Sequence, residues 1–444
     1  MPASTTLALG TSSYQLLDAF DAVEQINSIK VVRSGNATTN SASVTSLNGK
    51  TIENFGIGGL GWSDGTVANN SLNVSGNFEN FSADLAAGND TLNIVGNLSG
   101  AFIELDDSSS ASSGNDRLQI SKNLTSTSPS SPEQRNQIFT GAGNDTIQIG
   151  GLLEDTNMYL GSGNDSLVVS GDANRIYVGS DAKSGFDTAA DGRDYLEFRG
   201  MVTDAVIQTG GGNDTVVFRK QFYGQSNQDI SDFDPLASVS AIDLGSGNDS
   251  LTLSAGASNA RISTGSGSDT LHFSGSFDNL AVNLGGDKVE LTGTAGSSFT
   301  NVDFSSASAD GDTLMVGAGF VFSETNFYLG SGDDSLVFGS GSLFNDVVFS
   351  TGDGADTLVF GTSTMFGNTY INLSDPSSGT DVVSFAEYDF IDLVTVAGGT
   401  SDILYIGSNK YVYGGPGAVS LEDDYTGQFG SPSSGWMGSW IKSV

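Results

Sequence analysis

The sequence predicts an all-β fold, a parallel β-solenoid with coils of roughly 20–22 residues. A turn of the form Gly-x-Gly-Asn-Asp recurs along most of the chain, as in residues 161–165. The distance in sequence between the aspartates of successive copies gives the length of one coil. It is the distance from Asp145 to Asp165 in some coils and the slightly longer distance from Asp312 to Asp334 in others. After the turn, apolar residues alternate with outward positions, as Leu167 and Val169 do, which is the period of a half-buried strand.

The constant spacing of the repeated turn is a better guide to the domain organisation than the length of the chain is. A chain of 444 residues would ordinarily form several domains, but a motif repeated at one spacing favours a single kind of solenoid. Sixty glycines and only seven prolines fit closely spaced turns. The absence of cysteine excludes disulfides, zinc-thiolate sites and thiol catalysis. We therefore expect stability to come from stacked coils and bound ions.

The chain is strongly acidic, with 16 Lys and Arg residues against 52 Asp and Glu residues and a net charge of −36. Such a surface repels nucleic acid and anionic lipid and attracts cations, so no nucleic-acid partner is expected. The longest apolar runs are far too short to span a membrane, and no Lys or Arg precedes Lys30, so neither membrane insertion nor a Sec signal peptide is predicted. We expect an extracellular or cell-surface protein exported without an N-terminal signal by a type I-like route, or a virion protein. Retention inside the cell is the remaining alternative.

Residues 1–50 do not carry the repeat. Apolar residues between Leu16 and Ile26 recur at three- and four-residue steps, which predicts a short helix. A cap that covers the apolar end of the first coil is one interpretation of this segment, and a docking element is the other.

The solenoid is expected over residues 51–405, with two short strands and two turns in each coil. Longer gaps between motif aspartates mark insertions, which map to loops on one side of a solenoid. The insertion after Asp214 carries Phe222, Tyr223 and Phe233 among acidic residues and is the candidate contact loop. A solvated excursion without a partner is the alternative.

One coil is degenerate, because residues 284–291 have lost two residues of the turn and include Lys288. If cations line this edge, Lys288 would replace one of them. Neutral drift of a single coil explains the same pattern.

Residues 406–444 form a third segment, in which the repeat ends and aromatic residues such as Trp436 and Trp440 are frequent. A C-terminal cap, an assembly contact and a secretion signal are the three interpretations of this segment.

The turn itself has the chemistry of a cation site. Glycine on both sides of the variable residue permits backbone angles that a Cβ forbids. The aspartate two residues after the second glycine places a carboxylate beside inward-turned carbonyl groups, and the next coil repeats the set. An all-oxygen site with two carboxylates suits a hard cation, and its flexible coordination favours Ca²⁺ over Mg²⁺.

The turn and the strand after it, Gly-Ser-Gly-Asn-Asp-Ser-Leu-Val-Val at residues 161–169, resemble the nonapeptide of RTX proteins, and copies cover roughly residues 86–405. The resemblance implies a β-roll that binds Ca²⁺ between turns through glycine carbonyls and the aspartate. The ligands that it implies are Asp90, Asp145, Asp165, Asp214, Asp249, Asp269, Asp334 and Asp356, with the carbonyls of Gly143, Gly163, Gly212, Gly247, Gly267 and Gly332. The core residues that it implies are Leu92, Ile147, Leu167, Val216, Leu251, Leu271, Leu336 and Leu358.

This chain departs from the RTX pattern, because only one of the two turns in each coil carries the motif. We therefore expect one row of ions along one edge, interrupted at the insertions and at residues 285–291. The alternative is that Asn and Asp build hydrogen-bonded ladders along the stack without metal. Repulsion between stacked carboxylates argues for a cation, which would also make Ca²⁺ a folding switch.

An enzyme is the less favoured interpretation, although β-helical solenoids include polysaccharide-degrading enzymes. The chain has one histidine, His272, at an outward position, and its only acidic cluster outside the repeat is Asp229, Asp232 and Asp234. A glycosidase needs a placed pair of carboxylates, which cannot be assigned here.

A non-enzymatic, calcium-stabilised extracellular protein that assembles with copies of itself, as an S-layer or surface-filament subunit does, is the function that the sequence favours. Outward positions after the motif turn apolar in later coils, at Val217, Met315, Val337 and Val359, and such a strip usually marks a contact. Cover by the chain's own C-terminal segment is the alternative. We expect self-contact through this face and the terminal segments. A bacteriophage appendage or fibre and an adhesin for cell-surface glycans are the alternative functions.

Overall fold

The computed structural model confirms the predicted all-β parallel solenoid. It describes these residues: 3–9, 26–33, 39–45, 51–53, 55–57, 69–85, 87–106, 114–126, 135–179, 192–224, 240–285, 288–306, 311–373, 379–386, 390–391, 394–398, 402–413, 418–421 and 440–442. The chain divides into two compact units, unit 1 (Met1–Lys220) and unit 2 (Gln221–Val444). In the described part of the chain, no helix is long and apolar enough to cross a membrane.

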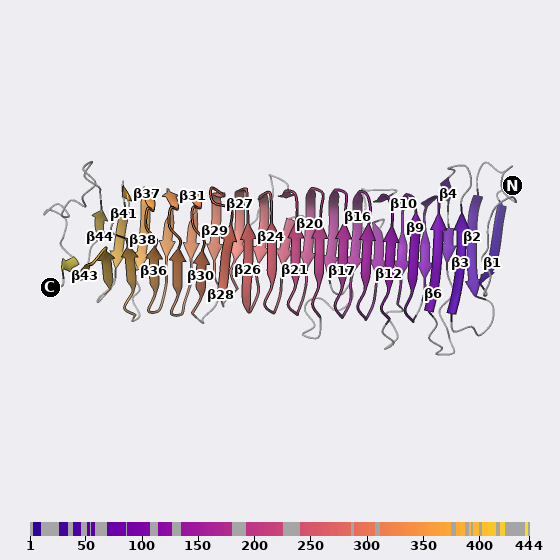
Figure 1. Ribbon diagram of the computed structural model, residues 1–444, viewed down its shortest axis with the longest axis horizontal. Coiled ribbons are helices and arrows are strands. Elements are labelled where there is room, and N and C mark those ends of the chain that lie inside the picture. The colour runs from indigo at the N-terminus through magenta and orange to yellow at the C-terminus, as the bar shows by residue number, and fades with distance from the viewer. Residues whose placement is uncertain are drawn as a thin grey trace. The chain divides into compact units, whose positions relative to one another are not determined.

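Each unit consists of two facing sheets whose strands stack side by side along the solenoid (Figure 1). We call sheet B the sheet whose strands follow the Gly-x-Gly-Asn-Asp turns, and sheet A the sheet of the returning strands. In unit 1, the sheet B strands are β3 (Thr39–Thr45), β6 (Asn69–Ser75), β9 (Thr91–Val95), β12 (Arg117–Ile120), β15 (Thr146–Ile149), β17 (Ser166–Val169), β19 (Tyr195–Phe198) and β21 (Thr215–Phe218). The sheet A strands of unit 1 are β1 (Ala3–Leu9), β2 (Ile26–Arg33), β4 (Thr51–Glu53), β5 (Phe55–Ile57), β7 (Asn77–Glu79), β8 (Ser82–Asp84), β10 (Leu98–Ser99), β11 (Phe102–Glu104), β13 (Leu124–Thr125), β14 (Asn136–Phe139), β16 (Leu153–Tyr159), β18 (Ala173–Gly179) and β20 (Val202–Gln208).

Unit 2 repeats this arrangement and ends differently. Its sheet B strands are β24 (Ser250–Leu253), β26 (Ser268–Phe273), β28 (Lys288–Gly293), β30 (Thr313–Val316), β33 (Ser335–Phe338), β36 (Thr357–Phe360), β39 (Val382–Phe385), β42 (Ile403–Ile406), β43 (Asn409–Tyr413) and β45 (Trp440–Lys442). Its sheet A strands are β22 (Phe222–Tyr223), β23 (Ser240–Asp243), β25 (Ala257–Ser263), β27 (Ser276–Asn283), β29 (Ser298–Ser305), β31 (Val321–Ser323), β32 (Asn326–Tyr328), β34 (Leu343–Asn345), β35 (Val348–Ser350), β37 (Met365–Gly367), β38 (Thr369–Leu373), β40 (Phe390–Ile391), β41 (Val394–Gly398) and β44 (Ala418–Leu421). The parallel stack ends where β43, β44 and β45 pair in antiparallel fashion.

Insertions leave the register of the stack unchanged. Leu167 of β17 pairs with Ile147 in the coil before it and with Leu196 in the coil after it. An insertion lies between Leu167 and Leu196 in the sequence, and none lies between Ile147 and Leu167. The extra residues therefore leave the coil at a turn and rejoin it in phase.

The degenerate coil shifts the register by two residues. Leu271 of β26 pairs with Leu291 of β28, so the inward column continues, but Asp269 pairs with Val289 and not with another aspartate. Side chains alternate between the two faces of a strand, so a shift by two keeps each residue on its face. The two-residue loss noticed in the sequence therefore displaces the turn without exposing the core.

The predicted N-terminal helix falls mostly outside the described residues, which omit residues 10–25. Its last predicted member, Ile26, begins strand β2, which runs parallel to both β1 and β5. A helix that includes Ile26 is therefore wrong, because the backbone at this position pairs in a sheet.

Inward side chains of the two sheets form the core. The eight core residues implied by the repeat are all buried, from Leu92 in β9 to Leu358 in β36. In unit 2, phenylalanines stack from coil to coil: Phe277, Phe299, Phe322, Phe344 and Phe366 form one column with ring centroids 4.9 to 5.3 Å apart. The Phe222 side chain of the predicted contact loop is also buried, so it is core and not contact surface.

We expect Phe322→Ala to lower the free energy of unfolding by about 3–5 kcal/mol, since it removes a buried ring that touches rings in the coils on both sides. Urea denaturation followed by circular dichroism measures this change. Tyr328→Ala, at an outward position of the same coil, is the matched control and should change stability by less than about 1 kcal/mol. Equal effects of the two substitutions would contradict the assigned core.

Candidate functional site at the aspartate turns

The structure places the eight predicted aspartates in buried rows that run along the stack. In unit 1 the row is Asn70, Asp90, Asp116, Asp145, Asp165, Asp194 and Asp214, and in unit 2 it is Asp249 and Asp269, then Asp312, Asp334, Asp356, Asp381 and Asp402. Five of these aspartates were not among the predicted ligands: Asp116, Asp194, Asp312, Asp381 and Asp402. Their turns have lost the first glycine or the asparagine of the motif. Each of these aspartates still precedes a strand with alternating apolar residues, and this position in the coil is the sequence signal that identifies them.

Three unbroken runs begin at Asn70, Asp249 and Asp312, and every aspartate after the first residue of a run accepts a hydrogen bond from the backbone of the coil before it. The Asp116 N–H donates to Asp145 Oδ1 over 2.7 Å, and the Asp145 N–H donates to Asp165 Oδ1 over 2.7 Å. The same bond, between 2.6 and 3.1 Å long, links each neighbouring pair from Asn70 to Asp214, the pair Asp249 and Asp269, and each pair from Asp312 to Asp402. In unit 1, the insertions before Asp145 and Asp194 do not interrupt this row of hydrogen bonds, because the chain rejoins the stack in phase. The register shift after Asp269 interrupts the row in unit 2.

An outer row of asparagines runs beside the aspartates with the opposite direction of hydrogen bonding. The Asn164 N–H donates to Asn144 Oδ1 over 2.9 Å, so here the acceptor belongs to the preceding coil. The same contact recurs from Asn69 to Arg193 in unit 1. The Asn-Asp pair in each turn therefore supplies acceptors to the coil on either side, where the turn backbone has no strand partner.

The glycines permit the turns to stack in direct contact. Gly163 has a φ of +133°, and a Cβ built on it would lie 1.7 Å from the carbonyl oxygen of Gly143 in the coil before it. The predicted ligand carbonyls of Gly247 and Gly332 lie against the glycines of the next coil in the same way. These carbonyls face along the stack, and Ser162 between the glycines exchanges hydrogen bonds with Gly141 and Gly143.

Burial makes the aspartate rows electrostatically costly. The second carboxylate oxygens of Asp90, Asp116, Asp145 and Asp334 have no hydrogen-bond partner in the structure. Burial raises the pKa of Asp90 to about 8, of Asp116 to about 9, of Asp145 to about 6 and of Asp334 to about 7, and the backbone N–H groups that donate to them offset only part of this. At neutral pH the ladder therefore holds protons on some of its carboxyl groups unless a cation takes their place.

A further buried acid, Asp106, lies next to this row in unit 1. Its Oδ2 accepts the Gly114 N–H over 2.9 Å, and burial raises its pKa to about 7. Asp106 falls outside the repeat, so no sequence signal identified it.

The carboxylates alone do not assemble a metal site. In the parts of the chain that the structure describes, no three His, Cys, Asp or Glu side chains come together as metal ligands do. A calcium ion would have to take most of its six to eight oxygens from backbone carbonyls that already lie against the next coil. The observed arrangement is the hydrogen-bonded ladder that the sequence left as the alternative, and calcium binding at these turns stays a prediction.

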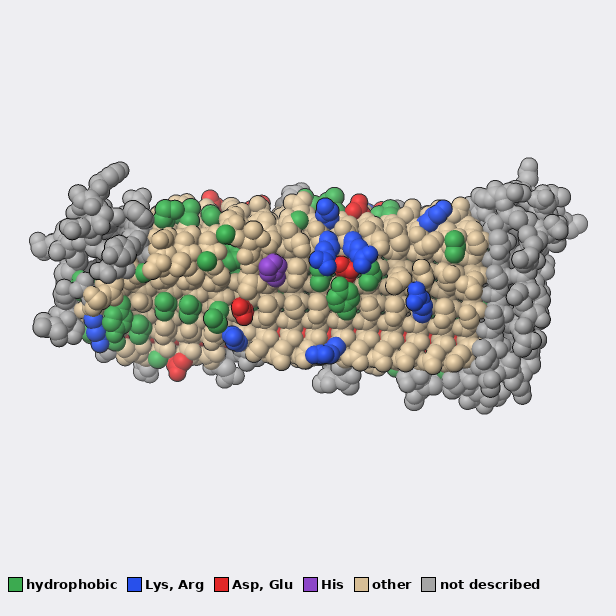
Figure 2. All heavy atoms as spheres, in the orientation of Figure 1, with side chains coloured by type: hydrophobic (Ala, Val, Ile, Leu, Met, Phe, Trp, Pro, Cys, Tyr) green, Lys and Arg blue, Asp and Glu red, His purple; other side chains and the backbone are tan. Residues whose placement is uncertain are grey.

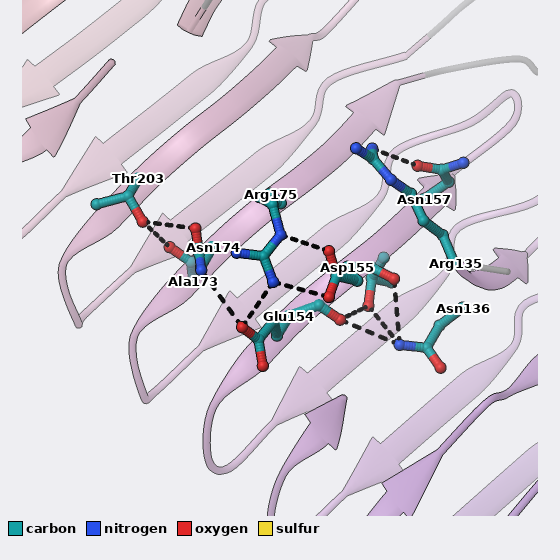
Figure 3. Close-up of polar contacts among 10 residues, drawn as sticks. Arg135, Asn136, Glu154, Asp155, Asn157, Ala173, Asn174, Arg175 and Thr203 are labelled. Carbon is teal, nitrogen blue, oxygen red and sulfur yellow. Dashed lines mark hydrogen bonds and ion pairs between the residues drawn. The ribbon is translucent and has the colours of Figure 1, made fainter. Parts of the chain in front are cut away.

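On the side opposite these turns, several described coils have a corner residue in the left-handed region of backbone conformation. Asp155, Arg175 and Asp204 occupy this position on successive strands, with φ values from 47° to 52°. Figure 3 shows Arg175 bonded to both oxygens of Asp155, at 2.6 and 2.8 Å, and to Glu154 at 2.8 Å. The sequence indicated no ligand pattern at this turn, and the structure shows paired charges here.

Comparisons with known proteins add little to this geometry. No protein-family model and no curated protein matches the chain. One solved structure with a similar fold is a hyperactive, Ca²⁺-dependent, β-helical antifreeze protein from an Antarctic bacterium. The match has 18% sequence identity and a TM-score of 0.39, and it covers 80% of this chain and 86% of that one. So distant a likeness carries no argument about ligands or function.

In a calcium-free buffer, Asp145→Ala should lower the free energy of unfolding by about 1–3 kcal/mol, because the buried Asp116 N–H loses its acceptor. Asp145→Asn keeps an acceptor oxygen and removes a buried charge, so it should stay within about 1 kcal/mol of the wild type. Ser162→Ala in the adjacent turn is the control. Chemical denaturation in EGTA measures all three. If both Asp145 variants were less stable than the wild type only when Ca²⁺ is present, the result would contradict the hydrogen-bonded ladder.

The pH dependence of stability separates the two interpretations by its sign. Raised carboxyl pKa values mean that the folded state binds protons more tightly than the unfolded state, so in EGTA the free energy of unfolding should fall from about pH 4 to about pH 9. Calcium ligands must be deprotonated, so a calcium-held turn gains stability over the same range in excess Ca²⁺. Denaturation curves at pH 5 and pH 8.5 in each buffer measure the slope. A rise with pH in EGTA would contradict the raised pKa values.

Proposed function

We propose that this chain is a non-enzymatic structural protein that acts outside the cell and assembles with copies of itself. The supporting observation is an apolar column on the outer face of sheet B in unit 2. Met315, Val337 and Val359 face outward on β30, β33 and β36, and each pairs with the next across neighbouring strands. Met315 is 40% exposed, which is high for a large apolar side chain.

Sheet A of the same unit carries a second outward apolar column. Val321, Leu343 and Met365 begin strands β31, β34 and β37 and pair in register, and Met365 is 45% exposed. Figure 2 shows rows of hydrophobic side chains on the visible face of this unit. Rows of exposed apolar side chains at a constant spacing favour contact with a surface of the same period, and a second copy of the chain is the simplest such surface.

The outward strip does not extend into unit 1 as the sequence suggested. Val217 is only 7% exposed, and it pairs with Glu197, whose carboxylate binds Arg199 at 2.8 Å and Arg219 at 2.9 Å. Val217 is therefore excluded from the proposed contact surface. The Glu197 pKa is lowered, mainly by its bond to Arg199.

The contacts of the one histidine support a non-enzymatic role. His272 faces outward, and its Nδ1 lies 3.0 Å from Thr292 Oγ1, a neutral partner that does not tune a catalytic base. The acidic cluster Asp229, Asp232 and Asp234 lies outside the described residues.

The proposal also includes calcium binding and an extracellular location, and both rest on the sequence. The net charge of −36 and the RTX-like turns favour a calcium-rich exterior, where cations would offset the buried carboxylates. An S-layer or surface-filament subunit fits this best. A virion appendage and a glycan-binding adhesin are alternatives that use the same scaffold.

We expect Val337→Lys to weaken self-association, because it places a charge in the middle of the apolar column. Light scattering after size-exclusion chromatography should show wild-type particles larger than a monomer and a shift of the variant towards monomer mass. Thr252→Lys, at the corresponding outward position of β24, is the matched control. A monomeric wild type in the presence and absence of Ca²⁺, or a Val337→Lys variant with unchanged particle size, would refute assembly through this surface.

A further inference from the structure

A stack of aromatic rings lies on the outside of unit 1. Phe102, Phe139, Tyr159 and Tyr177 come from β11, β14, β16 and β18, the sheet A strands of four successive coils. Their ring centroids are 5.7, 4.9 and 5.4 Å apart in that order, and Phe139 and Tyr159 are stacked at 13°. We call these four residues the outer aromatic ladder.

The ladder continues to Tyr177 because the Tyr177 ring occupies the space beside Tyr159 where Gly179 has no side chain. Gly179 pairs with Tyr159 across the strands, and a Cβ on Gly179 would lie 2.3 Å from Tyr177 Oη. The Tyr177 ring therefore lies over Gly179, beside Tyr159. Its hydroxyl group donates to Gln208 Oε1 over 2.8 Å, which orients the ring.

Packing of the core does not account for these rings. The inward residues at the same rungs, Ile138, Met158 and Val178, are aliphatic and buried, whereas Phe102 is 43% exposed. Phenylalanines that stabilise the stack in unit 2 face inward and are buried. An exposed ring lacks the stabilisation that burial would give, about 25 cal/mol for each Å² of apolar surface. A row of such rings on the outer face therefore indicates a ligand that covers them.

Hydrogen-bonding groups flank the ladder. Gln137 and Asn157 lie between Phe102 and Tyr177 in one outward column, beside the column of Phe139 and Tyr159. Arg135 donates to Asn157 Oδ1 over 3.4 Å (Figure 3). Amide and guanidinium groups both donate hydrogen bonds, and amides also accept them. The face thus combines flat apolar rings with polar groups at their edges.

The charge of this face is close to neutral in a chain of net charge −36. Near the ladder, Arg175 is paired with Asp155 and Glu154. Glu104 is level with Phe139, and Arg135 bonds to Asn157, so three carboxylates are counted against two guanidinium groups. The acidic remainder of the protein repels polyanions, and cations are attracted elsewhere. The charge of the face therefore matches a neutral polymer.

We propose that the outer aromatic ladder binds a neutral polysaccharide that lies extended along the stack. The C–H face of each pyranose ring would pack on the aromatic rings, while its hydroxyl groups bond to Gln137, Asn157 and Arg135. Strands repeat every 4.8 Å or so along the sheet, a length close to one sugar ring of an extended chain, so neighbouring sugars meet successive rings. This binding goes beyond self-assembly and uses the other unit of the chain.

The test is affinity electrophoresis of the full-length protein in gels that contain hydroxyethyl cellulose, xyloglucan or dextran, with polygalacturonate as the anionic probe. We expect at least one neutral polymer to retard the protein and polygalacturonate to have no effect. Tyr159→Ala should weaken retardation about tenfold or more, since it removes the central ring, whereas Tyr159→Phe should keep it. Phe102→Ala, at the exposed end of the ladder, should weaken it as well.

Tyr328→Ala is the matched control, because Tyr328 is a tyrosine of unit 2 that is 45% exposed and outside the ladder. Circular dichroism checks that each variant folds, and light scattering checks its particle size. No retardation by any neutral polymer, retardation only by polygalacturonate, or equal loss in Tyr328→Ala would overturn the proposal. A change of particle size in Tyr159→Ala with unchanged retardation would assign the ladder to self-association instead. Failure of Val337→Lys to alter assembly bears on the proposed structural function and leaves this result intact.

Discussion

Hydrogen bonding of the turn backbone is the constraint on which the rest of each unit depends. Strands in stacked coils pair with one another, but a sharp turn leaves N–H groups with no strand partner. Here short side chains complete the pairing: aspartates serve the preceding coil and asparagines the following one. Glycines bring the turns close enough for these short side chains to reach. The motif Gly-x-Gly-Asn-Asp is thus explained residue by residue as a stacking device.

This device has an electrostatic cost that shapes the chemistry of the whole chain. A carboxylate is the shortest side chain that accepts a hydrogen bond with two oxygens, but each buried copy adds a charge in a poorly hydrated row. Desolvation is the main cause of the raised pKa values of Asp90, Asp116 and Asp145, and neighbouring carboxylates raise the pKa of Asp90 and Asp116 further. Protons and cations relieve the same cost, so the sequence pattern fits the observed ladder and is also compatible with the predicted calcium-bound turn.

The sequence predicted the fold and the inward residues because both follow from period alone. The recurrence of one turn at a nearly constant spacing defined the coil, and alternation after the turn identified residues such as Leu167 as core. It also located eight of the aspartates. Asp116 and Asp194 belong to looser copies of the turn and were not among the predicted ligands, because their turns have lost motif residues.

Other features depended on contacts that no local pattern contains. The direction of the hydrogen bonds is a relation between coils, which the pattern of a single turn does not contain. Val217 was expected outside, but the ion pairs of Glu197 with Arg199 and Arg219 lie beside it, and arginine partners cannot be assigned from spacing. The outer aromatic ladder was missed for the same reason: Tyr177 joins it only because Gly179 leaves room.

The opposed directions of the two ladders have a consequence for how such a chain changes over generations. Within an unbroken run such as Asp116 to Asp165, each coil accepts a hydrogen bond from the coil before it and donates one to the coil after it. Duplication or loss of one whole coil would leave each remaining turn fully matched, whereas loss of an odd number of strand residues would turn the inward column outward. The length of the stack is therefore free to vary in steps of one coil.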